Sequence, residues 1–272
     1  MIDNRINNMD RFCTLATHSS AALGQPLVSV VIPVFNQRGR IEKAIKSVLD
    51  QGCDCFELIV IDGGSSDGTR EIIAGFSDCL SYWVSEPDDG VYHAMNKGVI
   101  HASGRWVYFL GSDDLMLDVL GEVANHLRQD NVLYYGDILM ASDGSRKGGS
   151  FNARLLSRRN IPHQAIFYPR QVFDKYQFDQ RYRVAADYHL NLRCFADAEF
   201  VFEHLPLPIA VFEDETGLSS VTEDPLFAME KPRMIKEYLG IEIYIEFKIR
   251  EALRKFERHF LRRVLGIFSR CG

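Results

Sequence analysis

The sequence has few cysteines, no long apolar run and no signal-like apolar core. Its six cysteines among 272 residues show no paired framework, and Cys53 and Cys55 have no second pair or histidine at ligand spacing. They therefore predict reduced thiols without a function, not disulfides or a metal site. No run reaches the ~18 apolar residues that span a bilayer. The first 25 residues lack the core of a signal peptide and predict a flexible leader, so we expect a cytoplasmic protein.

The chain also lacks an excess of positive charge. Its net charge of −6 argues against a general nucleic-acid binder. The charge is uneven, because residues 246–270 hold eight basic and three acidic residues and carry +5. With 46% hydrophobic and 25% charged residues, the chain can form a core without disulfides or metals. We find no internal repeat and no low-complexity segment.

Apolar, β-branched runs alternate with amphipathic segments as far as Asp114. Strands are expected at 27–34, 57–61, 80–84 and 106–110, and helices at 40–50, from about Thr69, and at 91–102. This alternation predicts an α/β fold whose central sheet is mostly parallel and carries helices on both faces.

After Asp114 the pattern changes. Helices are expected at 117–128, 185–195, 224–239 and 243–266, and strands at 132–140, 165–168, 199–203 and 207–212. The turn at 141–149 joins two extended arms, which predicts antiparallel additions to the sheet. We therefore expect a leader at 1–25, one globular domain at 26–222, and a basic, amphipathic helical extension at 223–272.

Acidic residues follow the ends of three expected strands. They are Asp62, Glu86, Asp88, Asp113 and Asp114. An acid just past a buried strand lies at the edge of the sheet where α/β proteins bind ligands. A group of acids at one edge suits a divalent cation, and a divalent cation suits a diphosphate. The sequence therefore predicts that this edge handles a nucleotide.

The segments after the first two strands offer groups for a nucleoside. Asp62 can accept a hydrogen bond from a base N–H, or it can cap its own turn through a neighbouring serine. Phe35 can stack on a base, and Asn36 can reach the base or the ribose. The alternative for this pair is a Pro–Asn turn with a core aromatic residue.

Asp113 and Asp114 are adjacent carboxylates at the end of the fourth strand. They repel each other unless a cation or a base lies between them, which favours a metal site over a solvated turn. Mg²⁺ or Mn²⁺ fits such oxygen ligands and would neutralise a departing nucleoside diphosphate. Lys97, late in its helix, either reaches a phosphate or is a solvated lysine near the helix end.

Two residues in the second half are candidates for proton transfer. Asp187 lies at the start of an expected helix, where it is either an N-terminal cap or a general base for an acceptor hydroxyl. His163 follows Pro162 near an expected strand, and a lone histidine in such a place is more often structural than a ligand.

Six motifs in the chain, taken in order, resemble those of the family 2 glycosyltransferases. They are PLVSVVIPVFN, LIVIDGGSSDGT, SEPDDGVYHAMNKG, GRWVYFLGSDD, PHQAIFY and VAADYHLNLR, and they cover roughly residues 27–220. The similarity is greatest to small enzymes that assemble bacterial surface polysaccharides such as colanic acid or O-antigen. The resemblance implies a GT-A fold, a nucleotide-sugar donor, Mn²⁺ or Mg²⁺, and inversion at the anomeric carbon. A UDP-linked donor and a glycan or lipid-linked acceptor are the expected partners.

The family pattern also implies roles for individual residues. Nucleoside contacts fall on Pro33, Phe35, Asn36 and Asp62, and Glu86 and Asp88 fall in the donor cleft. Asp113 falls on the last acid of the D-x-D metal motif, and Asp187 on the catalytic base. To the nucleotide-sugar contacts we add Lys97 and Asp114, on the residue arguments above.

The sequence departs from that pattern in several places. Gly111 stands where many members have the first acid of D-x-D, which leaves fewer direct metal ligands. Gly63 stands where many have a second acid after strand two. Asp89 and His93 replace what is often a basic and an acidic residue. The Q-x-x-R-W signature and the transmembrane helices of processive members are absent, so the sequence predicts a single-addition transferase.

Two other functions stay open at this level. One is a catalytically silent nucleotide-binding protein on the same fold, which Gly111 favours and Asp187 does not. The other is a nucleotidyltransferase, which would be expected to carry a Gly- and Arg/Lys-rich phosphate loop after strand one. FNQRGR is a poor match to such a loop.

The C-terminal extension has an apolar stripe with basic flanks. Its apolar residues recur every three or four positions and are Ile245, Ile249, Ala252, Leu253, Phe256, Phe260, Val264, Leu265 and Phe268. Such a helix suits an anionic membrane surface and would place the enzyme at the inner face of the plasma membrane. The alternative is that the stripe packs on the globular domain or on a second subunit.

Overall fold

The computed structural model describes residues 25–215 and 223–268, with side chains described as far as Glu257. Its strands are β1 (Val28–Val34), β2 (Phe56–Asp62), β3 (Tyr82–Ser85), β4 (Trp106–Phe109), β5 (Leu115–Met116), β6 (Val132–Met140), β7 (Arg146–Lys147), β8 (Ile166–Pro169) and β9 (Val201–Phe212). Its helices are α2 (Ile41–Leu49), α3 (Thr69–Ala74), α4 (Val91–His101), α5 (Leu120–Ala124), α6 (Ala153–Leu156), α7 (Gln171–Lys175), α8 (Ala186–Ala196), α10 (Pro225–Leu239) and α11 (Ile241–Phe268), with short 3-10 turns η1 (Ser77–Cys79) and η2 (His163–Ala165).

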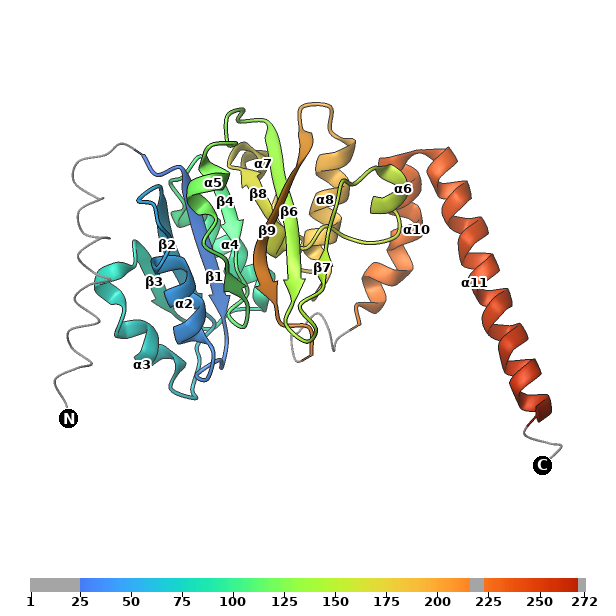
Figure 1. Ribbon diagram of the computed structural model, residues 1–272, viewed down its shortest axis with the longest axis horizontal. Helices are drawn as coiled ribbons and strands as arrows, with labels where there is room; N and C mark the ends of the chain where they lie inside the picture. The colour runs from blue at the N-terminus through green and yellow to red at the C-terminus, as the bar shows by residue number, and fades with distance from the viewer. Residues whose placement is uncertain (1–24, 216–222, 269–272) are drawn as a thin grey trace.

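The described strands form one mixed sheet (Figure 1). Their order is β3-β2-β1-β4-β8-β6-β9-β5, and β7 pairs with β6 beside this path. Strands β1 to β4 run parallel, whereas β8 is antiparallel to both of its neighbours, β4 and β6. The chain leaves β1 toward β2 and β3 and later returns on the other side of β1 as β4. The ends of β1 and β4 therefore flank a switch point, where open α/β sheets bind ligands.

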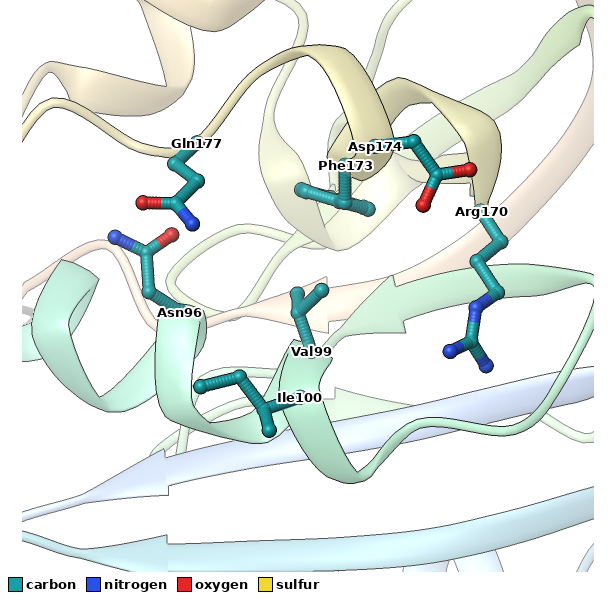
Figure 2. Close-up of a pocket in the computed structure, with 7 residues that line it drawn as sticks. All are labelled: Asn96, Val99, Ile100, Arg170, Phe173, Asp174 and Gln177. Atoms are coloured by element: carbon teal, nitrogen blue, oxygen red, sulfur yellow. The ribbon is translucent and has the colours of Figure 1, made fainter.

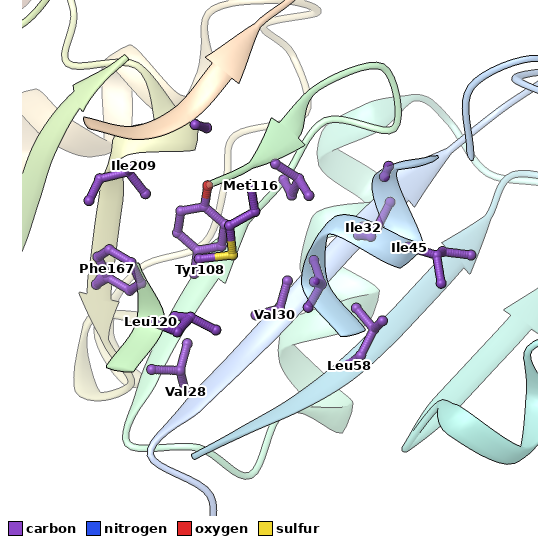
Figure 3. Packing of buried hydrophobic residues seen from close by; sticks show 14 of the residues in the cluster. Val28, Val30, Ile32, Ile45, Leu58, Tyr108, Met116, Leu120, Phe167 and Ile209 are labelled. Atoms are coloured by element: carbon purple, nitrogen blue, oxygen red, sulfur yellow. The ribbon is translucent and has the colours of Figure 1, made fainter. Parts of the chain in front are cut away.

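Helices cover both faces of the sheet. One face packs against α2, α3 and α5, around a core that includes Ile45, Leu58 and Leu120 (Figure 3). The other face packs against α4, α7, α8 and α10. Because both faces are covered, β1 is buried along its whole length, as its continuous apolar run predicts.

The predicted α/β fold is confirmed. Strands β1 to β4, β6 and β8 and helices α2, α4 and α8 each begin and end within two residues of the ranges expected from the sequence. The short strand β7 pairs antiparallel with β6 through the turn after Met140, which confirms the antiparallel addition.

Other expectations were wrong in detail. The helix expected at 117–128 is only the five-residue α5. The two strands expected at 199–203 and 207–212 are one strand, β9, which pairs with β6 on both sides of an irregularity at Asp137 and Pro208. Pro206 and Pro208 interrupt the alternation of apolar and polar residues along β9. In the sequence, this one irregular strand therefore looks like two regular strands. Strand β5 and helices α6 and α7 were not expected, because they are too short to produce a period.

Two helices extend the fold at its C-terminal end. Helix α10 begins after Asp224, whose side chain accepts a hydrogen bond from Phe227 N at 3.1 Å. Helix α11 is tied to α6 by an Arg154–Glu246 ion pair and then projects away from the sheet (Figure 1). None of the helices in the described ranges is long and apolar enough to cross a membrane. The expected leader lies almost wholly outside the described residues, as does the segment before the expected boundary at residue 223.

Candidate active site

The chain segments after β1 and β2 are hydrogen-bonded to each other. Asn36 N donates to Ser65 Oγ at 2.7 Å, and Ser66 N donates to Asn36 Oδ1 at 3.0 Å. Two further bonds follow, in which Gln37 N donates to Thr69 Oγ1 at 2.9 Å and Arg38 N to Asp67 Oδ2 at 3.0 Å. Asn36 has a φ of 51°, a left-handed conformation that asparagine adopts more readily than most residues. The two loops therefore form one interlocked platform.

The aromatic ring expected to stack on a base is open to solvent. Phe35 is 58% exposed at the end of β1, which is unusual for a large apolar side chain beside a buried strand. Pro33, by contrast, is buried within β1 and lies beyond the last β1–β4 pair, Val31 with Phe109. Of the two, Phe35 is the one a planar ligand can reach directly.

Asp62 is fully buried at the end of β2. Its carboxylate accepts hydrogen bonds from Ser65 N at 3.1 Å, from Ser65 Oγ, and from Ser85 Oγ at 2.5 Å. These contacts are those of the turn cap, one of the two roles that the sequence left open. Before Asp62 can accept a hydrogen bond from a nucleobase, Ser65 Oγ or Ser85 Oγ must rotate away from its carboxylate.

The loop after β3 carries Glu86 and Asp88 and is held against α4. Lys97 Nζ lies 2.8 Å from Glu86 Oε1 and donates to Pro87 O at 3.2 Å. The hydrogen bond and charge of Lys97 lower the pKa of Glu86. Asp88 accepts a hydrogen bond from Gly90 N at 2.9 Å. Lys97 therefore fixes this loop, and a phosphate would have to compete with Glu86 for its charge.

The adjacent acids after β4 lie in different environments. Asp114 is buried, with Oδ2 accepting from Gln164 Nε2 at 2.7 Å and Oδ1 from Glu213 N at 2.9 Å. Burial raises the pKa of Asp114 to about 6, although the bond from Glu213 N acts in the opposite direction. The Asp113 side chain is more open, at 17% exposure. Asp113 is therefore the carboxylate that a ligand or metal can reach.

The cation beside Asp113 is Arg40, at the start of α2. Arg40 Nη1 lies 3.8 Å from Asp113 Oδ2, and Nη2 lies 3.7 Å from Glu213 Oε2. Both distances allow charge attraction but are too long for hydrogen bonds. The guanidinium thus lies between two carboxylates at the switch point and donates a hydrogen bond to neither of them.

Both glycine departures from the family pattern are places where another acid fills the space. A β-carbon on Gly111 would collide with Asp114 Oδ2 and lie 3.0 Å from Asp113 Oδ1. A β-carbon on Gly63 would lie 2.6 Å from Asp88 Oδ2. An acidic side chain at position 111 would need the space that the buried Asp114 carboxylate occupies. The two therefore cannot be present together in this arrangement.

Asp187 lies in the first turn of α8 and is 6% exposed. Its Oδ1 accepts from Tyr92 Oη at 2.9 Å and from Tyr188 N at 2.8 Å, and its Oδ2 accepts from Asn160 Nδ2 at 2.8 Å. His163 Nδ1 is 3.5 Å from Oδ2. Burial raises the pKa of Tyr92 well above its ordinary value, so this hydroxyl stays protonated and donates. The N-terminal cap of α8 is Ala185, so Asp187 is not the capping residue.

The site fits a metal ion only together with a diphosphate. Within the described ranges, no group of three or more His, Cys, Asp or Glu side chains is placed to hold a metal. Asp113 and Glu213 offer two carboxylates on either side of Arg40. Mg²⁺ is commonly held by one or two carboxylates plus substrate phosphates, which such a pair can supply.

Sequence reasoning missed four residues of this site. Glu213 follows the end of β9, so the strand-end rule that predicts Asp62 applies to it as well. Arg40 lies at the start of α2, outside the six family motifs. Tyr92 and Asn160 have no local signal, because only the folded chain brings them to Asp187.

A cavity of about 190 Å³ lies between α4 and α7 (Figure 2). Its lining residues are Asn96, Val99, Ile100, Arg170, Phe173, Asp174 and Gln177. Asn96 exchanges two hydrogen bonds with the backbone of Phe178, and Arg170 donates to Ala102 O. Because none of the predicted site residues lines it, this cavity is separate from the acids described above.

Residues 29–189 match the sequence profile of Glycosyl transferase family 2. A PGL/p-HBAD biosynthesis glycosyltransferase of Mycobacterium bovis is 38% identical over 232 residues, which covers 82% of this chain and 90% of the relative.

Solved structures share the fold at low identity. S. aureus TarS 1–349, in complex with UDP-GlcNAc, superposes with a TM-score of 0.61 at 15% identity and covers 78% of this chain and 71% of its own. The mannosyltransferase PcManGT of Pyrobaculum calidifontis, with GDP-Man and Mn²⁺, gives 0.56 at 17% identity and covers 90% and 72%. The shared fold is the GT-A glycosyltransferase fold, as the sequence motifs predict.

Proposed function

The chain belongs to glycosyl transferase family 2 and is a glycosyltransferase, and on this premise we propose that it moves a sugar from a UDP-linked donor to a hydroxyl group, with inversion. The carrying observation is the pairing of Arg40 with Asp113 at the switch point, beside the interlocked loops after β1 and β2. Because the chain belongs to this family, we prefer sugar transfer to the two alternatives, a silent nucleotide-binding protein and a nucleotidyltransferase.

The donor lies along the edge formed by the ends of β1, β2 and β4. Phe35 stacks on the base, Asn36 and the Asp62 turn contact the nucleoside, and the loop of Glu86 and Asp88 borders the sugar. Arg40 contacts the diphosphate, whose negative charge the guanidinium can pair with bidentately. The nucleotide sugars bound to the related structures, UDP-GlcNAc and GDP-Man, support a donor of this class.

The residues around Asp113 would hold Mn²⁺ or Mg²⁺ with the donor, and such an ion supplies charge for the leaving diphosphate. Asp113 provides the ligand, and Glu213 is near enough to provide a second. Asp114 lies beneath them and fixes Gln164 and the backbone at Glu213. The negative charge of Asp187 assists removal of the proton from the acceptor hydroxyl while the oxygen of this hydroxyl attacks the anomeric carbon.

The acceptor is a glycan or a lipid-linked saccharide in surface polysaccharide synthesis. The names of relatives support this class, since one is a putative teichuronic acid biosynthesis glycosyltransferase of Bacillus subtilis. The exposed stripe on α11 supports it further. Ile245, Ile249, Leu253 and Phe256 are 50–69% exposed, and the segment is basic whereas the chain as a whole is acidic. We propose that this face lies on anionic lipid and keeps the enzyme at the membrane surface.

The direct test is release of UDP from a panel of UDP-sugars with Mn²⁺, using octyl glycosides as acceptors. We expect release that depends on both sugar and acceptor, and an Asp187→Asn variant about 10²–10⁴-fold slower with nearly unchanged UDP affinity. GDP- and dTDP-sugars serve as competing donors. An Asp187→Asn enzyme that keeps more than a tenth of the turnover would remove Asp187 from the reaction.

A further inference from the structure

The carboxylate of Asp187 has little room for an acceptor hydroxyl. A carboxylate offers about four lone-pair positions. Three are taken, two at Oδ1 by Tyr92 Oη and Tyr188 N, and one at Oδ2 by Asn160 Nδ2. His163 Nδ1 lies 3.5 Å from Oδ2, with no hydrogen bond between them. A sugar hydroxyl therefore has at most one open position on this carboxylate, beside the His163 ring.

His163 is the more accessible member of this pair. Its side chain is 17% exposed, against 9% for that of Asp187. In the described part of the chain, no hydrogen bond to the His163 ring is formed, and the only buried side-chain nitrogen or oxygen without a partner is Ser145 Oγ. The ring nitrogen that does not face Asp187 is therefore in contact with solvent.

The segment that carries His163 connects the two halves of the site. Asn160 donates to Asp187, and Gln164 donates to Asp114 at the end of β4. The Gln164 carbonyl in turn accepts a hydrogen bond from Tyr108 Oη at 2.9 Å. His163 is thus fixed between the acids of the donor edge and the carboxylate of α8. The charged groups that face it are Asp187 from α8 and Asp114 from the β4 end, with the neutral Tyr92 hydroxyl behind Asp187.

We propose that His163 accepts the proton of the acceptor hydroxyl and that Asp187 orients and stabilises its ring. The proposal rests on the proposed function and names the group at which its proton transfer takes place. A histidine whose Nδ1–H points to a carboxylate keeps Nε2 unprotonated and basic, which is the arrangement of a catalytic His–Asp pair. The 3.5 Å separation suits a ligand-free site, where such bonds are often long and tighten with substrate.

The step balances as a displacement. The acceptor oxygen forms its bond to the anomeric carbon while its proton passes to His163 Nε2. The bond from the anomeric carbon to the diphosphate breaks, and its electron pair leaves on the diphosphate oxygen. The imidazolium is held by Asp187 and returns its proton to solvent after the product departs.

Imidazole tautomer is a readout that needs no substrate. We would label histidine with ¹⁵N in the full-length protein and assign His163 by comparison with His163→Gln. At pH 8 we expect Nδ1 to carry the proton in the wild type, and the Asp187→Asn variant to shift the ring toward the Nε2–H form. A wild-type ring found as Nε2–H has no free Nε2 lone pair and overturns the proposal.

Kinetics then separates this proposal from the proposed function. His163→Gln should lower kcat for UDP release about 10²–10⁴-fold, with UDP affinity within about threefold of the wild type. The pH dependence of kcat should also differ between wild type and His163→Gln, because a different group then has to accept the proton. His126→Gln, at an exposed histidine after α5, should match the wild type.

Two results would contradict the idea. A His163→Gln enzyme that keeps more than a third of wild-type kcat, with the same pH dependence, would return the base to Asp187. A wild-type protein that binds no UDP contradicts the proposed function instead, while the tautomer measurement still decides the His163–Asp187 pair.

Discussion

The guanidinium of Arg40 lies 3.8 Å from the Asp113 carboxylate and 3.7 Å from that of Glu213, so it is attracted by both and hydrogen-bonded to neither. A charge held in this way is free to form new hydrogen bonds without first breaking strong ones. We expect the diphosphate of the proposed donor to accept such bonds.

Arg40→Gln should therefore weaken binding of UDP. A hydrogen bond to a charged group contributes about 1.5–3 kcal/mol, so we expect about 10- to 100-fold lower affinity by calorimetry. Arg40→Lys should keep part of it, because the charge remains but the bidentate geometry does not. Lys43→Gln, on the exposed side of α2, is the matched control. Equal affinity for Arg40→Gln and wild type would exclude a diphosphate contact.

Asp113→Ala should abolish the part of UDP binding that depends on Mn²⁺. The reason is that Asp113 is the accessible acid beside the proposed diphosphate position, whereas Asp114 is buried and already hydrogen-bonded. Titrations of wild type with and without EDTA should differ, and those of Asp113→Ala should coincide. Asp78→Ala, at an exposed acid in η1, should behave as wild type. Full wild-type activity in EDTA would rule out this role.

Gly111→Asp should lower stability and should not improve metal binding. Its β-carbon collides with the Asp114 carboxylate, and overpacking of this kind costs about 1–3 kcal/mol. We expect Tm to fall by about 2–10 °C. Adding Asp114→Gly removes the collision, so the double variant should lose less than the two single changes together. Purely additive losses would show that the two positions do not interact.

Lys231 should make stability depend on pH in a defined direction. Burial, with the charge of Arg254, lowers the pKa of Lys231 from 10.5 to about 8, although the Tyr188 ring, whose centre lies 4.4 Å from Nζ, favours the charged amine. The folded state thus favours the neutral amine, and its penalty for holding the charge is complete below pH 8 and vanishes as pH rises to about 10.5. The Tm of Lys231→Met relative to wild type should therefore be higher at pH 7 than at pH 10.

The comparison for Lys231 is Lys236→Met, at an exposed lysine of the same helix. Its Tm difference from wild type should be the same at both pH values. A Lys231→Met difference that also stays constant would mean that Lys231 keeps its charge in the folded protein throughout this range.

The exposed face of α11 should bind anionic vesicles. We expect the full chain to sediment with phosphatidylglycerol vesicles, less so with phosphatidylcholine, and less at high salt. Ile249→Glu with Leu253→Glu should abolish sedimentation, while Met229→Glu on α10 should not, although Met229 is also exposed. Size-exclusion chromatography checks the alternative, pairing of two chains. Equal sedimentation of the double variant and wild type would exclude this face as the anchor.

The parts of the fold that the sequence predicts are those with a strong local period. β1 and β2 are buried on both faces and read as continuous apolar runs, so their bounds and the polar residues after them follow directly. The irregular strand β9 does not, because its pairing with β6 changes register in the middle.

The candidate site is predictable only in part, for the same reason. The motifs and strand ends single out Asp113 and Asp187, but nothing in the sequence indicates the residues that contact them. Arg40 reaches Asp113 across 73 positions of chain, and Tyr92 reaches Asp187 across 95. Nothing local in the sequence distinguishes the buried Asp114 from the accessible Asp113, because the difference comes from Gln164 and from the backbone at Glu213.

The interlocked loops after β1 and β2 have a mechanical consequence. Four hydrogen bonds join the segment at Asn36–Arg38 to the segment at Ser65–Thr69, so neither can shift alone. Phe35 precedes the first segment and Arg40 follows it. In the proposed complex, the nucleoside base and the diphosphate therefore contact two ends of one stiff segment. We expect a nucleoside bound at Phe35 to restrict the position of Arg40 before any phosphate is present.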